Sequence, residues 1–315
     1  MLKKWIQQRA LLLSWARPGR SSRTKCFGVV MVMLAGFLSS VSFAMAADTS
    51  AQISTEALPS QEPPAQVDAA AWDHAAWNQL LKTHVVVLRE GQATEVNYQA
   101  LATQRADLKS YLHRLGQVNA VTFDSWGKAE QLAFLINAYN AWTVELILTQ
   151  YPDLASIKDL GSWFSSPWSK PFIPLLGESR SLDDIEHKLI RGSGRYNEPR
   201  IHFAVNCASI GCPALRAEAY TATKLDAQLA DQTSKFMMDR SRNRPTNDGL
   251  VLSAIFKWYR DDFEQGWNGI DQLETFLVGQ ATALGLSAEE VVQLQRGKLP
   301  LQYDDYDWRL NDIAD

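Results

Sequence analysis

EQLAFLINAYNAWTVELIL, residues 130–148, has the clearest helical pattern in the chain. Apolar side chains occupy nearly every side of a helix drawn through this segment, and a helix that is apolar all round is buried. Two asparagines interrupt the apolar surface, Asn137 and Asn140, three positions apart and therefore on one side of the helix. We predict a buried central helix here, around which the rest of the domain packs.

The two amides of this helix need hydrogen-bond partners, because buried polar groups are nearly always paired. Asn137 and Asn140 could hold the backbone of neighbouring loops in place. They could instead donate hydrogen bonds to an oxyanion or a bound ligand. The sequence leaves both alternatives open, and both asparagines are candidate ligand-binding residues.

The rest of the chain predicts more helices and a few short strands. Helices are expected at 71–84, 98–116, 181–191, 223–239, 254–262, 270–284 and 288–296. Extended segments are expected at 85–88, 200–207, 250–252 and 299–310. Because the strands do not alternate regularly with the helices, the expected class is α+β, a mainly helical single domain with a small sheet, spanning residues 71–315.

The N-terminal segment has the pattern of a signal peptide. A basic start without acidic residues precedes an apolar run from Cys26 to Phe43, and Ala44-Met45-Ala46 offers small residues for cleavage. We predict a signal peptide at 1–46, the alternative being an anchor that stays attached. Residues 47–70, rich in Ala, Pro, Ser and Gln, are expected to be a disordered linker. The predicted location is the periplasm of a Gram-negative cell or its exterior.

Cleavage at this point would change the charge of the protein. Seven of the 31 basic residues and none of the 35 acidic residues lie in 1–46, so 24 basic residues would face 35 acidic ones, a formal charge of −11. An acidic surface repels phosphate backbones, which argues against a nucleic-acid partner. Membrane contact is expected only through an uncleaved N-terminal segment. The expected partner is an unknown small-molecule, peptide or glycan ligand.

Cleavage would also leave Cys207 and Cys212 as the only cysteines. In an oxidising compartment the pair could form a disulfide. Alternatively, one cysteine could be a nucleophile activated by His202 or His187, and Cys212 is the better candidate because it is expected in a loop. Zinc bound by these four side chains is the weakest alternative, since the spacing matches no standard pattern. No metal or other cofactor is therefore predicted.

The predicted strand at 200–207 has polar side chains on one face. With a period of two, His202 and Asn206 share a face with Ala204, opposite an apolar face. Buried without partners, they would cost about 1–3 kcal/mol each. They could contact neighbouring loops or line a pocket.

The predicted helix at 181–191 carries a carboxylate where an apolar residue is expected. Glu186 falls inside the apolar arc of this helix, and His187 lies at its edge. A buried carboxylate needs a partner, for which Arg191, Arg200 and His202 are the candidates. The pair could fix helix to strand, or Glu186 could orient a catalytic histidine.

Four stretches together resemble a known family. These are FLINAYNAWTVELIL (134–148), SLDDIEHKLIR (181–191), PRIHFAVNCASIGCPAL (199–215) and YDWRLN (306–311). Their order is similar to that in the domain of unknown function 547 family, over residues 95–311. The resemblance implies an exported bacterial member of that family, and it implies no established activity.

Two hypotheses for the function remain open. The first is a thiol-dependent hydrolase or transferase, with Cys212 as nucleophile, His202 or His187 as base and Glu186 as the orienting group. Every histidine precedes both of these cysteines, the opposite order from papain-like enzymes. The second is a non-catalytic envelope domain with a Cys207–Cys212 disulfide that binds a ligand or partner. Arg200 and Asn206 join Asn137 and Asn140 as candidate ligand-binding residues.

Overall fold

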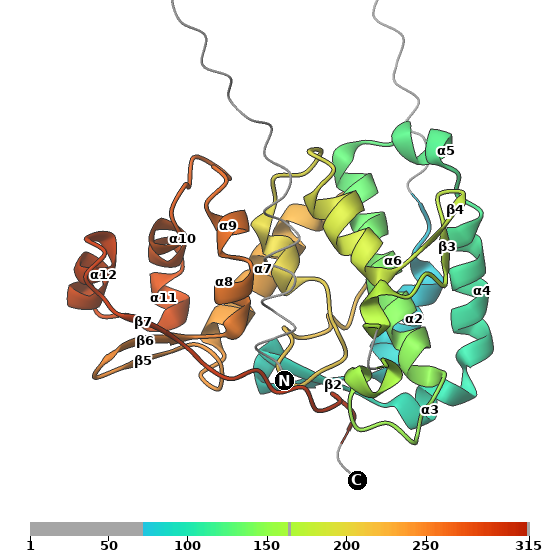
Figure 1. Cartoon of the computed structure of the whole chain (residues 1–315), viewed down its shortest axis with the longest axis horizontal. Coiled ribbons are helices and arrows are strands. Elements are labelled where there is room, and N and C mark those ends of the chain that lie inside the picture. Colours follow the sequence, from blue (N-terminus) through green and yellow to red (C-terminus); the bar gives the residue numbers. More distant parts are fainter. Residues whose placement is uncertain (1–71, 163–164, 314–315) are drawn as a thin grey trace, which may run out of the picture. The chain divides into compact units, whose positions relative to one another are not determined.

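The computed structural model describes residues 72–162 and 165–313, which fall within one compact unit (Figure 1). The predicted signal peptide at 1–46 and the linker at 47–70 lie outside the described residues. Within the described ranges, no helix is long and apolar enough to cross a membrane.

The central helix α6, Lys128–Leu148, confirms the prediction made from its sequence. Its side chains are buried on almost every side, with Leu135 and Ile136 fully inaccessible. Figure 1 shows α6 between α4 and the 181–191 segment, both of which contact it. This helix is therefore the scaffold on which the surrounding loops are placed.

The N-terminal part of the described chain combines four helices with one hairpin. The elements are α2 Ala75–His84, β1 Val85–Leu88, η1 Arg89–Gly91, β2 Ala93–Val96, α3 Tyr98–Thr103, α4 Arg105–Gly116 and α5 Ala120–Asp124. β1 and β2 pair antiparallel, with Val85 opposite Val96. The helix predicted at 98–116 is two helices, α3 and α4, which meet at Gln104.

The middle of the chain consists mostly of short turns. The elements are η2 Ile157–Leu160, η3 Pro167–Ser169, β3 Ile173–Leu175, β4 Glu178–Arg180, the π-helix η4 Asp184–Arg191, the 3-10 helix η5 Pro199–Phe203 and α7 Leu225–Met238. β3 and β4 form an antiparallel hairpin.

The strand predicted at 200–207 is wrong, because this segment begins as the 3-10 helix η5. Pro199 has the backbone angle of a first helical turn, and the Glu198 side chain accepts a hydrogen bond from the Arg200 N–H. Farther along, the Ala204 carbonyl and the Asn206 N–H pair with the side chain of one residue, Asn140, at 2.9 and 2.8 Å. Backbone groups that a sheet would use are thus taken by a turn and by α6.

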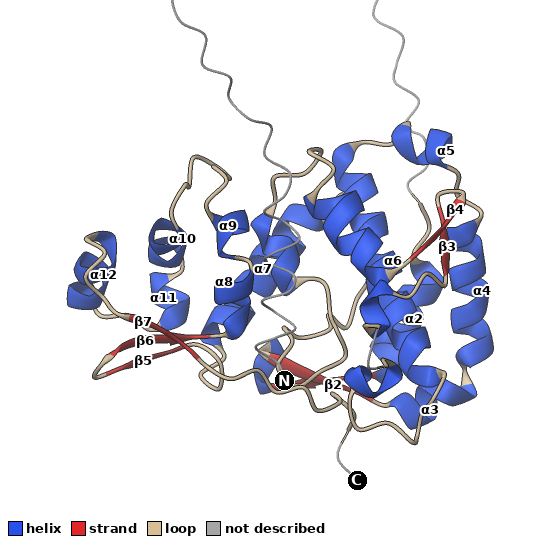
Figure 2. Ribbon diagram, viewed as in Figure 1, coloured by secondary structure: helices blue, strands red, loops and turns tan. Residues whose placement is uncertain are grey.

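The C-terminal part has a small sheet covered by short helices (Figure 2). The elements are β5 Arg244–Thr246, β6 Gly249–Leu252, α8 Ala254–Trp258, α9 Arg260–Phe263, α10 Leu273–Gly279, α11 Ala281–Leu284, α12 Ala288–Gln295 and β7 Leu301–Tyr303. β6 pairs antiparallel with β5 and parallel with β7. Helices with small sheets confirm the α+β class. One apolar core surrounds α6 and a second lies under this sheet.

Candidate functional site

The π-helix η4 places three charged or polar side chains together, Glu186, His187 and Arg191. Ser181 and Asp184 cap its start reciprocally, each side chain accepting from the other's backbone N–H at 3.0 and 2.8 Å. At its end the Gly192 N–H donates to the carbonyl of His187, five residues back. Such wide turns are rare and frequently occur at functional sites.

Asp262, in α9, is the centre of the polar cluster. Its Oδ2 accepts hydrogen bonds from His202 Nε2 at 2.7 Å and from Arg191 Nε at 2.5 Å. Its Oδ1 accepts from a second nitrogen of Arg191 at 2.9 Å. Burial would raise the pKa of Asp262, but these two partners hold it well below its ordinary value. The aspartate is therefore ionised and joins η4, η5 and α9.

Glu186 lies in the interior next to this cluster. Burial would raise its pKa, but His187, His202, Arg191 and a hydrogen bond from Tyr259 lower it overall. Its side chain is only 8% exposed, and its Oε1 has no hydrogen-bond partner among the described residues. The sequence correctly predicted that a buried Glu186 needs charged neighbours. It did not predict that one carboxylate oxygen stays available.

His187 is a partly exposed neighbour of Glu186. Its Nδ1 lies 2.8 Å from an Arg191 nitrogen and 3.7 Å from Glu186 Oε1, while its Nε2 lies 3.6 Å from Asp183 Oδ1. The side chains of His187, Asp183 and Arg191 are 25%, 19% and 26% exposed. Leaving the histidines aside, three carboxylates share this site with one guanidinium, so the site is negative.

Two tyrosines complete the wall around Glu186. The Tyr259 ring stacks on the imidazole of His202, with centroids 3.9 Å apart. Burial first and then the charge of Glu186 raise the pKa of Tyr259 and Tyr139 well above the ordinary value. Both hydroxyls therefore keep their protons and can donate hydrogen bonds to the carboxylate.

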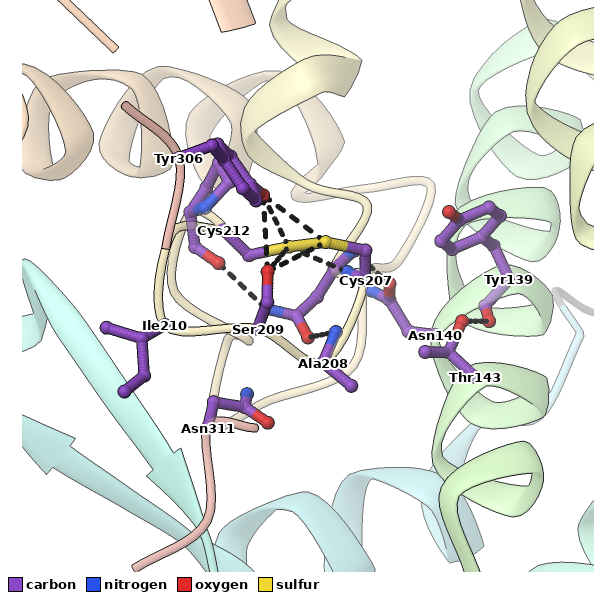
Figure 3. Close-up of a disulfide and its surroundings, with 12 residues drawn as sticks. Tyr139, Asn140, Thr143, Cys207, Ala208, Ser209, Ile210, Cys212, Tyr306 and Asn311 are labelled. Carbon is purple, nitrogen blue, oxygen red and sulfur yellow. Dashed lines mark hydrogen bonds between the residues drawn. A yellow bond between two sulfur atoms is a disulfide. The ribbon is translucent and has the colours of Figure 1, made fainter. Parts of the chain in front are cut away.

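Cys207 and Cys212 form a disulfide, as one of the sequence alternatives predicted (Figure 3). The hydroxyl of Tyr306 lies 3.2 and 3.1 Å from the two sulfur atoms, and Ser209 Oγ lies 3.1 Å from that of Cys207. The charge of Glu186 also contributes to raising the pKa of Tyr306, after burial. Tyr306 therefore contacts both sulfur atoms of the disulfide and is also influenced by the charge of Glu186. The sulfur of Cys212 is bonded and is no nucleophile in this state.

The predicted ligand-binding asparagines hold loop backbone. Asn140 pairs with Ala204 and Asn206, as described above. Asn206 Nδ2 donates to the Pro213 carbonyl at 2.8 Å, and its Oδ1 accepts from the Ala208 N–H at 2.9 Å. The Asn206 side chain thus ties the start of the disulfide loop to the residue that follows its end. Asn140 and Asn206 therefore both hold the backbone of neighbouring loops in place, which was one of the alternatives given for each.

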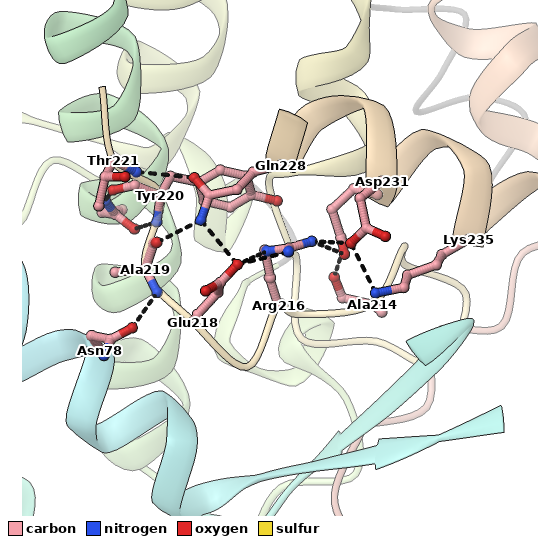
Figure 4. Close-up of polar contacts among 12 residues, drawn as sticks. Asn78, Ala214, Arg216, Glu218, Ala219, Tyr220, Thr221, Gln228, Asp231 and Lys235 are labelled. Carbon is pink, nitrogen blue, oxygen red and sulfur yellow. Dashed lines mark hydrogen bonds and ion pairs between the residues drawn. The ribbon is translucent and has the colours of Figure 1, made fainter. Parts of the chain in front are cut away.

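Asn137 holds the next loop in the same way. Its Nδ2 donates to the Tyr220 carbonyl at 2.8 Å, and its Oδ1 accepts from the Tyr220 N–H at 3.1 Å. Figure 4 shows the polar contacts that attach the 214–221 segment to α7, among them Arg216 with Asp231 and Gln228 with Ala219. This loop is fixed from two sides, by α6 and α7.

Arg200, one of the three candidate partners of Glu186, pairs with other carboxylates. Its guanidinium contacts Glu198 at 2.7 Å and Asp226 at 2.8 Å, above the ring of Trp267. It fixes the start of η5 to α7.

Sequence reasoning missed four members of the site: Tyr139, Tyr259, Asp262 and Tyr306. Tyr139 and Tyr306 stand in the segments FLINAYN and YDWRLN that carry the family resemblance, so a signal existed for them. Tyr259 and Asp262 stand in no such segment.

Two other kinds of feature in the described chain could mark a site, a metal-binding group and a cavity. Within residues 72–162 and 165–313, no three His, Cys, Asp or Glu side chains are grouped so that they could hold a metal ion. A cavity of about 250 Å³ is lined by Leu146, Asp153 and Lys170, among others, and by none of the site residues.

Fold and site define an α+β domain with a disulfide loop beside a buried acidic cluster. Comparison with known families gives this class a name. The model of the family "Protein of unknown function, DUF547" matches residues 123–237, so this part of the chain is similar to that family. The match includes the central helix, the π-helix and the disulfide loop. No curated protein and no solved structure matches the chain.

Proposed function

We propose that this protein is an exported, non-catalytic domain of the cell envelope that binds a small ligand bearing an ammonium group. The observation that carries the proposal is the buried, ionised Glu186, whose Oε1 accepts no hydrogen bond within the described residues. An oxygen of a buried carboxylate that accepts no hydrogen bond is costly, so Oε1 is suited to a ligand that supplies the donor.

The charge of the site selects the kind of donor. Glu186, Asp183 and Asp262 outnumber the single guanidinium of Arg191, which favours a cation over an anion. His187 is a quarter exposed, and turning its ring would open the way to Glu186. Ammonium groups occur in amino sugars and at peptide N-termini, which fall within the ligand classes expected from the sequence.

Two matched pairs of compounds test this proposal. We expect glucosamine and Ala-Ala to raise the melting temperature of the full chain, and their N-acetylated forms, which lack the ammonium, to have no effect. Glu186→Gln should abolish the response. Glu145→Gln is the control, because Glu145 is an equally buried carboxylate whose oxygens are already paired with Arg105. Equal stabilisation by acetylated and free amines, or a response that survives in Glu186→Gln, would refute the proposal.

A thiol count distinguishes this proposal from a thiol-dependent hydrolase or transferase. Protein purified without reductant from the periplasmic fraction should contain no reactive thiol at Cys207 or Cys212, because the two form a disulfide. An accessible thiol at Cys212 would favour the enzyme instead. The intact mass of the same sample tests export, since cleavage after Ala46 removes a defined mass.

A further inference from the structure

The sulfur of Cys212 is surrounded by hydrogen-bond donors. The backbone N–H of Cys207 donates to it at 2.9 Å and the Tyr306 hydroxyl at 3.1 Å, and the Ser209 hydroxyl lies 3.5 Å away. The two hydroxyls also lie 3.2 and 3.1 Å from the sulfur of Cys207, so the backbone N–H is the donor that distinguishes Cys212. A sulfur in a disulfide is a weak acceptor and gains little from such donors. A thiolate at the same place would gain much more, because hydrogen bonds to charged groups are the strong ones. The surroundings of Cys212 therefore suit a thiolate.

The two sulfur atoms differ in their access to solvent. Cys212 is 4% exposed, whereas Cys207 is half-buried. Beside them, the side chain of Ile210 is exposed at the tip of the loop. A thiol that approaches from solvent therefore meets Cys207, and Cys212 is the sulfur that would leave. Exchange is fastest when the leaving thiolate is stabilised.

The loop between the two cysteines is fixed by contacts that do not depend on the disulfide. The N–H of Ile210 donates to the Arg309 carbonyl at 2.9 Å, and that of Gly211 donates to the Asp307 carbonyl at 2.8 Å. Asn206 ties the start of the loop to its end, as described above. After reduction the two thiols would stay close together, which favours renewed formation of the bond.

We propose that Cys207–Cys212 undergoes reversible thiol–disulfide exchange with an external dithiol, with Cys207 as the attacked sulfur and Cys212 as the leaving thiolate. One thiolate of the dithiol forms a bond to the sulfur of Cys207 while the Cys207–Cys212 bond breaks, and Cys212 takes the electron pair. The second thiol of the reagent then displaces Cys207. The dithiol leaves as a disulfide, and both protein cysteines are reduced. The reverse steps oxidise the protein.

The test measures how fast dithiothreitol reduces the folded, full-length protein. All variants carry Cys26→Ser, so that every thiol counted after alkylation comes from the pair. Tyr306→Phe removes one donor to the leaving thiolate, and we expect reduction to be roughly tenfold slower. In the reduced protein the same change should raise the pKa of the Cys212 thiol, followed by the ultraviolet absorbance of the thiolate. Tyr303→Phe is the matched control, because its hydroxyl bonds to Arg260 instead.

Two further measurements keep the result unambiguous. A short exposure to glutathione, stopped by acid, should place the glutathione on Cys207. If Tyr306→Phe does not fold, Ser209→Ala removes the other hydroxyl within reach of the Cys212 sulfur, 3.5 Å away, and should slow reduction in the same direction by a smaller factor. Reduction only after unfolding, equal rates for Tyr306→Phe and Tyr303→Phe, or glutathione found on Cys212 would each overturn the proposal. The amine site is tested through Glu186 and would not be affected by that outcome.

Discussion

Replacing Asp262 by asparagine should destabilise the protein more than any exposed ion pair could explain. The carboxylate accepts two hydrogen bonds from Arg191 and one from His202, and its side chain is 14% exposed. Asparagine keeps the shape but removes the charge, so the partly buried Arg191 loses the carboxylate to which it donates two hydrogen bonds. Breaking a buried pair by removing one partner costs about 3–5 kcal/mol. Because Arg191 is a quarter exposed, we expect about 3 kcal/mol.

The loss of stability in Asp262→Asn should depend on pH in a direction that follows from the pKa of Asp262. The pKa of Asp262 is held well below its ordinary value in the folded protein. Its stabilising contribution is therefore complete above the pKa of the unfolded chain and is lost only as the pH falls towards the folded value. The difference in free energy of unfolding between wild type and Asp262→Asn should stay constant from about pH 7 to pH 5, and shrink below about pH 4.

Urea denaturation at several pH values measures this difference. Asp124→Asn is the control, since Asp124 also pairs with an arginine, Arg195, but the two side chains are 52% and 43% exposed. Exposed pairs contribute about 0–1 kcal/mol, so this variant should be nearly neutral. A loss below about 1 kcal/mol in Asp262→Asn, or the same loss in both variants, would show that the cluster is not held as described.

Three other changes test the surroundings of the site by the free energy of unfolding. Burial lowers the pKa of His74 from 6.5 to about 4. The free energy of unfolding should therefore fall by about 3 kcal/mol as the pH drops from 6.5 to about 4, because the buried imidazole must then be protonated. His74→Gln should remove this pH dependence. Asn140→Ala should cost about 3 kcal/mol because two backbone groups in 204–206 lose their partner, whereas Thr143→Val, on the same helix, loses one local bond and should cost less than about 1 kcal/mol. Gly211→Ala should cost about 1–3 kcal/mol, since a Cβ there would lie 2.9 Å from the carbonyl oxygen of residue 307; Gly279→Ala has open space and should be neutral or slightly stabilising.

The sequence predicted the elements whose stability is local or depends simply on burial. The helix at 130–148 is apolar all round, and this pattern has one stable solution in a folded domain. The start of α12 was equally predictable, because Ser287 and Glu290 form a capping box in the structure. The sequence also predicted that Glu186 would be buried among charged groups.

The segment at 200–207 shows where such reasoning fails. Its alternating apolar residues satisfy the period of a strand, yet its backbone groups are paired by Glu198, by the turn itself and by Asn140. Asn140 lies more than 60 residues away, and no periodicity within eight residues can report on it. The open question about the partners of Asn140 and the wrong prediction of a strand at 200–207 therefore have one cause. Asn140 pairs with the backbone groups of Ala204 and Asn206, which a strand would have used for its own hydrogen bonds.

The same argument explains why half of the site was found and half missed. Glu186, His187 and His202 were conspicuous because each is a polar residue at a position where the local pattern expected an apolar or a paired one. Asp262 and Tyr259 are ordinary residues of a half-exposed short helix and its start, and their importance arises only from their contacts with His202 and Glu186. A charged residue at a position where the sequence pattern expects an apolar one thus indicates where a site is. The groups that pair with it, here Asp262 and Tyr259, are recognised only from their contacts in the folded chain.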